Sequence, residues 1–221
     1  LLEVRHAADE LALPDERNQP FVVAQIAPAV RAVDRAGRDV RRRLAAADGD
    51  AYRTDEQVLA RTEGDDLEDW IELVVSAPPG ADSVAVVLRL RNSLLNTILF
   101  YDIMLGDPGA RSLDWVGRDL EQVGPAVELA QWYQRRMGMG IAVQDRGTWR
   151  PVARLKDTGP VAWKDVAIAV PVLDRDSVRI RLSFPADNWR IDRVAVAGRF
   201  RRLPEGPLVH PLAAVRDAAE R

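Results

Sequence analysis

The residue types that most often do chemistry in proteins are scarce in this chain. It has no cysteine, which excludes disulfides, thiolate nucleophiles and Cys-ligated metal sites. Its two histidines, His6 and His210, lie near opposite ends of the sequence, and no third residue marks a metal site or proton relay beside them. Walker A, GxSxG, HExxH and GxGxxG motifs are also missing. We therefore expect no catalytic residues, no cofactor and no metal ligands.

Carboxylates cluster in three parts of the chain and leave two alternatives open. The clusters are Asp65-Asp66 with Glu68-Asp69, Asp48 with Asp50, and Asp174 with Asp176. Closely spaced acids can supply oxygen ligands for Ca²⁺, but none of these runs completes an EF-hand loop. A hydrolase would use facing acids such as Asp187 or Asp192, at a separation that a sequence does not reveal. Solvated turns account for all of these residues, so calcium binding and hydrolysis remain alternatives.

Tryptophan is the most informative residue type here, because an exposed Trp can stack on a sugar or anchor a protein partner. Four tryptophans fall on or beside expected strands: Trp70, Trp149, Trp163 and Trp189. A buried Trp fills a core instead, and we expect burial for most of these four. In a carbohydrate-binding protein, at least two of them should share one exposed face. Trp163 and Trp189 are the candidate ligand contacts.

Candidate partner contacts lie in a segment, residues 93–138, whose apolar residues have helical spacing. They are Phe100, Tyr101, Trp115, Trp132 and Tyr133. The spacing predicts three helices, the second capped by Ser112 and the third running from Pro125 to Gly138. Segments added to a rigid scaffold often carry its binding residues, so we expect this one to contact a partner.

The flanks of this segment alternate apolar and polar residues with a period of two, which is typical of half-buried strands. We expect strands at 70–75, 84–90, 141–145, 148–152, 161–172, 178–182 and 189–196. The Pro78-Pro79-Gly80 turn predicts that the first two pair antiparallel, with Glu72 facing an arginine. Arg146-Gly147 predicts a tight hairpin turn. Short helices are expected at 39–47 and 211–220.

These elements predict a mainly β fold, an antiparallel β-sandwich of jelly-roll or galactose-binding-like type with an inserted helical segment. The sandwich should occupy residues 1–198, with the insert at about 93–138 and a Pro-rich tail at 199–221. The 221 residues, 47% of them hydrophobic, suffice for a sizeable core. No apolar run reaches 18 residues, so we expect no membrane span. The chain begins at Leu1 without a Met, and we expect a trimmed or incomplete N-terminus.

Short motifs on both flanks carry a resemblance to a known family. They are TWRPV at 148–152, DTGP at 157–160, KDV at 164–166, SVRIR at 177–181 and WRID at 189–192, together with 1–10, 14–16 and 33–40. These segments are similar to a domain at the C-terminal end of bacterial FG-GAP/VCBS-repeat proteins, near the ASPIC/UnbV group, although Ala7 stands where that domain usually has proline. The resemblance implies an exported, all-β module beside a propeller, with no catalytic residues to carry over.

The charge balance narrows the class of partner. A net charge of −3 and a pI near 5.5 provide no global basic field for nucleic acid or an anionic membrane. We therefore predict a non-catalytic binding or assembly module, periplasmic or extracellular, that docks on another protein or larger complex, for example as an accessory subunit of a membrane complex. A carbohydrate-binding module is the first alternative, and a hydrolase with paired carboxylates is the second.

Overall fold

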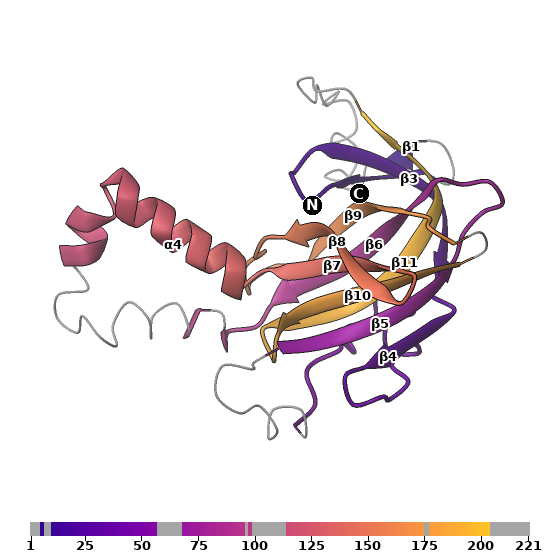
Figure 1. The fold of residues 1–221 in the computed structure, drawn as a ribbon, viewed down its shortest axis with the longest axis horizontal. Coiled ribbons are helices and arrows are strands. Elements are labelled where there is room, and N and C mark those ends of the chain that lie inside the picture. The colour runs from indigo at the N-terminus through magenta and orange to yellow at the C-terminus, as the bar shows by residue number, and fades with distance from the viewer. Residues whose placement is uncertain are drawn as a thin grey trace, which may run out of the picture.

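Two antiparallel sheets face each other in the computed structural model (Figure 1), which describes residues 5–6, 10–56, 68–95, 97–98, 114–174 and 177–203. The six-stranded sheet, here sheet A, has the strand order β1-β2-β3-β11-β6-β9. The five-stranded sheet, sheet B, has the order β4-β5-β10-β7-β8. The predicted antiparallel β-sandwich is confirmed.

The strands of the two sheets and the helices between them have the following bounds. Sheet A consists of β1 (Arg5–His6), β2 (Glu10–Pro14), β3 (Pro20–Pro28), β6 (Ser83–Asn92), β9 (Lys164–Pro171) and β11 (Trp189–Arg202). Sheet B consists of β4 (Arg31–Asp34), β5 (Glu68–Ser76), β7 (Met139–Asp145), β8 (Thr148–Leu155) and β10 (Ser177–Pro185). The π-helix η2 (Trp115–Asp119) and the α-helix α4 (Val123–Arg136) lie between β6 and β7.

Apolar side chains at every second position of both sheets fill the core between the layers. On β5, Ile71, Leu73 and Val75 are at most 1% exposed, and the inward residues of β6, β7 and β10 are buried in the same way. Burying one such side chain stabilises the fold by roughly 1.5–3 kcal/mol. The alternation that predicted the strands is therefore the same feature that holds the two sheets together.

A second, smaller core lies on the other face of sheet A. Ala85 and Val87 of β6 point away from sheet B and pack with Leu13, Phe21 and Val23 from β2 and β3. Strand β2 also contacts β9, although three strands separate them in the sheet order, so sheet A curls over this face. The Phe21 ring stacks on that of Phe200, with 5.1 Å between centroids, and helps to close the curl.

The predicted pairing of β5 with β6 is wrong. The two strands belong to different sheets, and the Pro78-Pro79-Gly80 turn connects one layer to the other. Glu72 does face an arginine across a ladder, but this is Arg181 of β10 and not an arginine of β6. Alternation shows that a strand has one buried face, and it does not distinguish a hairpin from a connection between two sheets.

The predicted hairpin around Arg146-Gly147 is confirmed, because β7 pairs with β8 across this turn. Both turn residues have positive φ, 49° and 87°, as a tight two-residue turn requires. Gly138, expected as a helix cap, is needed for a different reason. A Cβ atom there would lie 2.7 Å from the carbonyl oxygen of Leu155, so only glycine fits.

The helical predictions have mixed outcomes. α4 confirms the third helix of the segment 93–138 and extends away from the sandwich (Figure 1). The predicted helix at 39–47 is wrong, because residues 41–44 form turns there. Residues 99–113 and the predicted helix at 211–220 lie outside the described part of the chain. Strand β11 continues to Arg202, beyond the expected strand end at 196.

Two tryptophans share one arginine on the outer face of sheet B. The guanidinium carbon of Arg181 lies 4.8 Å from the Trp70 ring centroid and 4.3 Å from that of Trp149, so it stacks between the two rings. Its Nε donates to Glu72 at 3.2 Å. This stack links β5, β10 and β8 and so spans four neighbouring strands, with β7 lying between β10 and β8, which makes it a brace for sheet B.

We expect Arg181→Gln to lower the free energy of unfolding by about 1–2 kcal/mol, because it removes two cation–π contacts and a half-buried ion pair. Arg179→Gln is the matched control, since Arg179 is exposed on the same strand, and it should change stability by less than about 0.5 kcal/mol. Urea unfolding of both variants measures the difference. Equal effects would contradict the brace.

Candidate functional site

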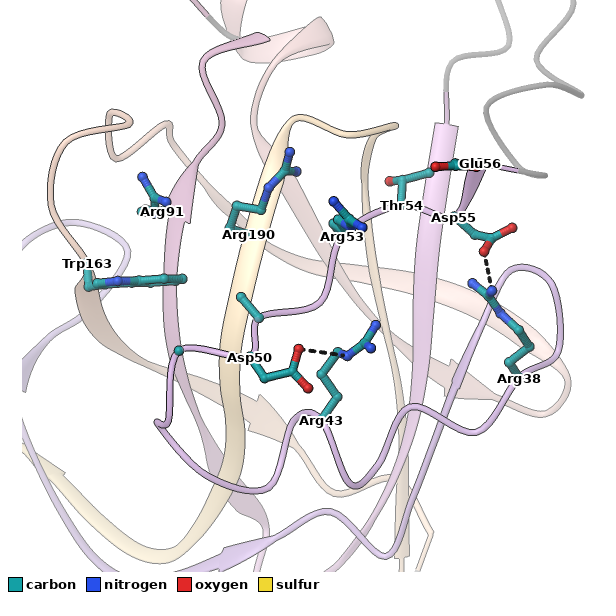
Figure 2. Close-up of a pocket in the computed structure, with 12 residues that line it drawn as sticks. Arg38, Arg43, Asp50, Arg53, Thr54, Asp55, Glu56, Arg91, Trp163 and Arg190 are labelled. Carbon is teal, nitrogen blue, oxygen red and sulfur yellow. Dashed lines mark hydrogen bonds and ion pairs between the residues drawn. The ribbon is translucent and has the colours of Figure 1, made fainter.

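A polar pocket of about 640 Å³ opens beside the ends of β6 and β11 (Figure 2). Its lining is Arg38, Arg43, Gly49, Asp50, Ala51, Arg53, Thr54, Asp55, Glu56, Arg91, Trp163 and Arg190. Five arginines and three carboxylates thus share the pocket with one aromatic ring. We call it the arginine pocket.

The register of sheet A places two of these arginines directly opposite each other. Arg91 of β6 pairs with Arg190 of β11, one residue before the inward pair Leu90 and Ile191. Both arginines therefore point to the face that lies away from sheet B. A bulge follows between Ile191 and Arg193, which strengthens the local twist at the pocket's edge.

The loop before β9 holds Arg91 in one orientation. Nη1 of Arg91 donates to the carbonyl oxygen of Pro160 at 2.7 Å, and its guanidinium carbon lies 5.0 Å from the Trp163 ring centroid. Asn92, which is fully buried, organises this loop. Its Oδ1 accepts from the amides of Thr158 at 2.7 Å and Gly159 at 2.9 Å. The Arg91–Trp163 stack is thus preformed by the strand end and the loop.

The opposite wall is the connection between β4 and β5, and it acts as a substitute strand. Strand β3 pairs with β11 only from Ala195 onward, which leaves the beginning of β11 open on one side. Tyr52 fills this place by exchanging two backbone hydrogen bonds with Ile191, at 2.7 and 3.2 Å, and the Val194 amide donates to the Leu44 carbonyl. The Leu44 carbonyl, which a helix at 39–47 would use internally, is thus bonded to β11.

A buried carboxylate anchors the same wall. Oδ2 of Asp69 accepts from the Tyr52 hydroxyl at 2.9 Å and from Thr54 Oγ1 at 2.7 Å, and Oδ1 accepts from the Trp70 amide. Burial raises the pKa of Asp69, and these three hydrogen bonds oppose the shift. Burial also raises the pKa of the Tyr52 hydroxyl. Arg53 lies between the two anchored residues and is exposed at the pocket.

Three of the five pocket arginines form ion pairs with neighbouring acids. Arg38 forms an ion pair with the buried Asp34 at 2.7 Å and another with Asp55. Arg43 pairs with Asp50 at 3.4 Å on the exposed rim. Arg53 forms no ion pair within the described part of the chain. Arg190 pairs with Asp187 at 2.7 Å. Among the described residues, the pocket arginines without an ion pair are therefore Arg53 and Arg91.

The sequence-predicted ligand residues separate in the structure. Trp163 lines the arginine pocket, whereas Trp189 is 0% exposed and belongs to the core between the sheets. Burial of Trp189 follows from its inward position at the start of β11. The candidate partner contacts cannot be placed: Phe100 and Tyr101 lie outside the described residues, as do the side chains of Trp115, Trp132 and Tyr133.

The acidic residues do not form one polar site. Asp192 is buried, accepts from the Gly49 amide at 2.8 Å and pairs with Arg89, whereas Asp187 pairs with Arg190. The expectation that Asp69 lies in a solvated turn is wrong, because this residue is on β5 and 0% exposed. Among the described residues, no group of three or more His, Asp or Glu side chains could hold a metal ion. His210, Asp65, Asp66 and Asp176 lie outside that part of the chain.

Sequence reasoning missed the arginines that define the pocket and the acid that supports it. Arginine is abundant in this chain, so no single arginine stands out by type. Asp69 did have a signal, because it shares the parity of Ile71, Leu73 and Val75 and should have been placed inside the core. For Arg91 and Arg190 the signal is the register of two strands that are far apart in sequence, and a sequence does not show it.

The solved structures that this chain resembles include two carbohydrate-binding modules, both at a distant level of similarity. The C-terminal CBM6 of LamC, a marine laminarinase from Zobellia galactanivorans, is 9% identical with a TM-score of 0.30, over 86% of this chain and 88% of that chain. TmCBM61 in complex with β-1,4-galactotriose is 15% identical with a TM-score of 0.28, over 62% of this chain and 66% of that chain. Likenesses this distant carry no argument about function.

Comparisons at the level of sequence add no relative. No family model matches the chain, and no curated protein matches it. The resemblance to FG-GAP/VCBS-repeat proteins therefore stays a prediction. None of the described helices combines the length and the hydrophobicity that a transmembrane helix needs.

The raised pKa of Asp69 predicts how stability depends on pH. The folded protein binds this proton more tightly than the unfolded chain, so the carboxyl stabilises the fold most below about pH 4 and loses that contribution as the pH rises through its raised pKa. Asp69→Asn cannot titrate. We expect the unfolding free energy of the native protein, minus that of Asp69→Asn, to fall as the pH rises above about 4. Urea unfolding across this range measures it, and a constant or rising difference would contradict the assignment.

Proposed function

We propose that the protein is a non-catalytic binding module and that its ligand is a carbohydrate held in the arginine pocket. The observation that carries this proposal is the preformed Arg91–Trp163 stack at the edge of an open, polar pocket. Sugars present hydroxyl groups and flat apolar ring faces, so their sites combine fixed polar groups with an aromatic side chain. An extracytoplasmic location, which the family resemblance implies, belongs to the same proposal.

The polar groups of the pocket support recognition better than catalysis. Asp50 and Asp55, the two Asp residues of the lining, are held by Arg43 and Arg38. Thr54 Oγ1 is occupied twice, since it donates to Asp69 and accepts from the Asp187 amide at 2.7 Å. Groups fixed in this way lose little conformational freedom on binding, which favours affinity.

We expect Trp163→Ala to weaken retention on an immobilised glycan array about tenfold or more, because the variant removes the ring and releases Arg91. The matched control is Trp149→Ala, which removes a Trp–Arg stack from sheet B and leaves the pocket intact. Both variants are first checked for cooperative unfolding. Glycan retention that is absent from the native protein, or equally reduced by both variants, would contradict the proposal.

Docking through the helical insert is a second candidate function, favoured by the exposed apolar residues of α4. Val123 is 80% exposed and Val127 is 46% exposed on a helix that extends away from the sandwich (Figure 1). Side chains of this kind often mark an interaction site when they occur together. An accessory subunit would use such a helix to contact a larger complex.

A photo-crosslinking residue at position 127 tests this second candidate in the native host. It should yield a discrete adduct with one partner, because Val127 would be covered in the complex. Position 179 is the control, since Arg179 is exposed on β10. The same adducts from both positions, or unlinked monomer alone from position 127, would exclude docking through this face of α4.

A further inference from the structure

We propose that the carbohydrate in the arginine pocket is acidic, and that Arg53, Arg91 and Arg190 bind its carboxylate or sulfate groups. This inference rests on the proposed function and names the ligand class. The inference is drawn from two cross-strand arginine pairs on the same face of sheet A. Carboxylates of the protein balance both charges of one pair and only one charge of the other.

The first pair is neutralised within the protein. Arg89 of β6 lies opposite Arg193 of β11. Nη1 of Arg89 pairs with Asp165 at 2.8 Å and its Nε pairs with Asp192 at 3.3 Å, whereas Arg193 reaches Asp165 at 4.0 Å. The Asp192 side chain is 3% exposed and that of Asp165 is 16% exposed. Two positive charges thus meet two shielded negative charges.

The second pair, one step along the same ladder, has only one carboxylate. Arg190 pairs with Asp187 at 2.7 Å. Arg91 forms no ion pair with any described carboxylate. Its Nη1 donates to a carbonyl group, and its Nε is buried with no hydrogen-bond partner in the described structure, as is the Nε of Arg193 in the first pair. Like charges on directly opposed residues destabilise an antiparallel pair, so this arrangement favours the arrival of an anion.

A third cation faces the same space. Figure 2 shows Arg91, Arg190 and Arg53 in a row along the pocket, contributed by β6, β11 and the β4–β5 connection. Arg53 is exposed, but its backbone is held by the buried neighbours Tyr52 and Thr54. Three arginines from three separate segments, each with a fixed backbone, therefore line the same pocket.

The size and charge of the pocket select among anionic ligands. A volume of about 640 Å³ is in the range of organic ligand sites and far exceeds what one inorganic anion fills. Guanidinium groups bind carboxylate and sulfate through paired hydrogen bonds. The protein as a whole has a net charge of −3, so its positive potential is local and does not favour an extended polyanion such as nucleic acid.

The experiment compares polymers that differ only in charge. Affinity electrophoresis of the full chain is run with polygalacturonate against its methyl ester, with dextran sulfate against dextran, and with single-stranded poly-dT. We expect at least one acidic polysaccharide to bind more than tenfold tighter than its neutral counterpart. Arg53→Gln, Arg91→Gln and Arg190→Gln should each weaken that binding about tenfold, whereas Arg179→Gln on sheet B should leave it unchanged.

Each outcome decides between the proposals. Preference for polygalacturonate assigns a carboxylate and preference for dextran sulfate assigns a sulfate, and both support the inference. Equal or tighter binding of the neutral polymers, lost in Trp163→Ala, overturns the acidic ligand and leaves the proposed function intact. Binding of no polysaccharide overturns both. Binding of poly-dT at equal strength, or equal loss in Arg179→Gln, reveals general polyanion attraction and also overturns the inference.

Discussion

The register between β6 and β11 places guanidinium groups opposite each other on adjacent strands, and the surroundings of these groups differ along the ladder. At Arg89 and Arg193 the fold supplies Asp165 and Asp192 as counter-charges. One step further, at Arg91, it supplies a carbonyl oxygen and an aromatic ring. Like charges directly opposite each other destabilise an antiparallel pair, so the rest of the structure has to hold these arginines in place.

The rest of the sandwich keeps these arginines in position by fixing both walls of the pocket. On one side, the buried Asn92 ties down the loop that leads to Trp163. On the other side, Tyr52 completes sheet A where β3 has ended, and the buried Asp69 secures the two residues that flank Arg53. The cost of burying the Asp69 carboxylate appears as its raised pKa. The buried Asp69 thus fixes, through Tyr52 and Thr54, the backbone that carries the exposed Arg53.

The sequence was a good guide to the sandwich and a poor guide to the site. The alternation of apolar and polar residues predicts strands β5, β7, β10 and β11, because the buried face of a strand shows as apolar residues at every second position of its own sequence. The partner of β5 does not follow, because Glu72 would face an arginine in either pairing. The pocket cannot be predicted from the sequence. Its lining comes from four segments that only the strand order brings together, and these carry Arg53, Arg91, Trp163 and Arg190. Asp69 is the exception, because its parity with Ile71 places it in the core.

Under the acidic-ligand proposal, two segments far apart in the sequence bind the same ligand, because the β4–β5 connection and strand β11 both contribute arginines to the pocket. A crystal structure of the full chain with bound trigalacturonate tests this most directly. We predict a ligand carboxylate within about 3 Å of the guanidinium groups of Arg91 and Arg190, as charge-assisted hydrogen bonds require. A ligand found on another face, or in the pocket with its carboxylates turned to solvent, would contradict the account.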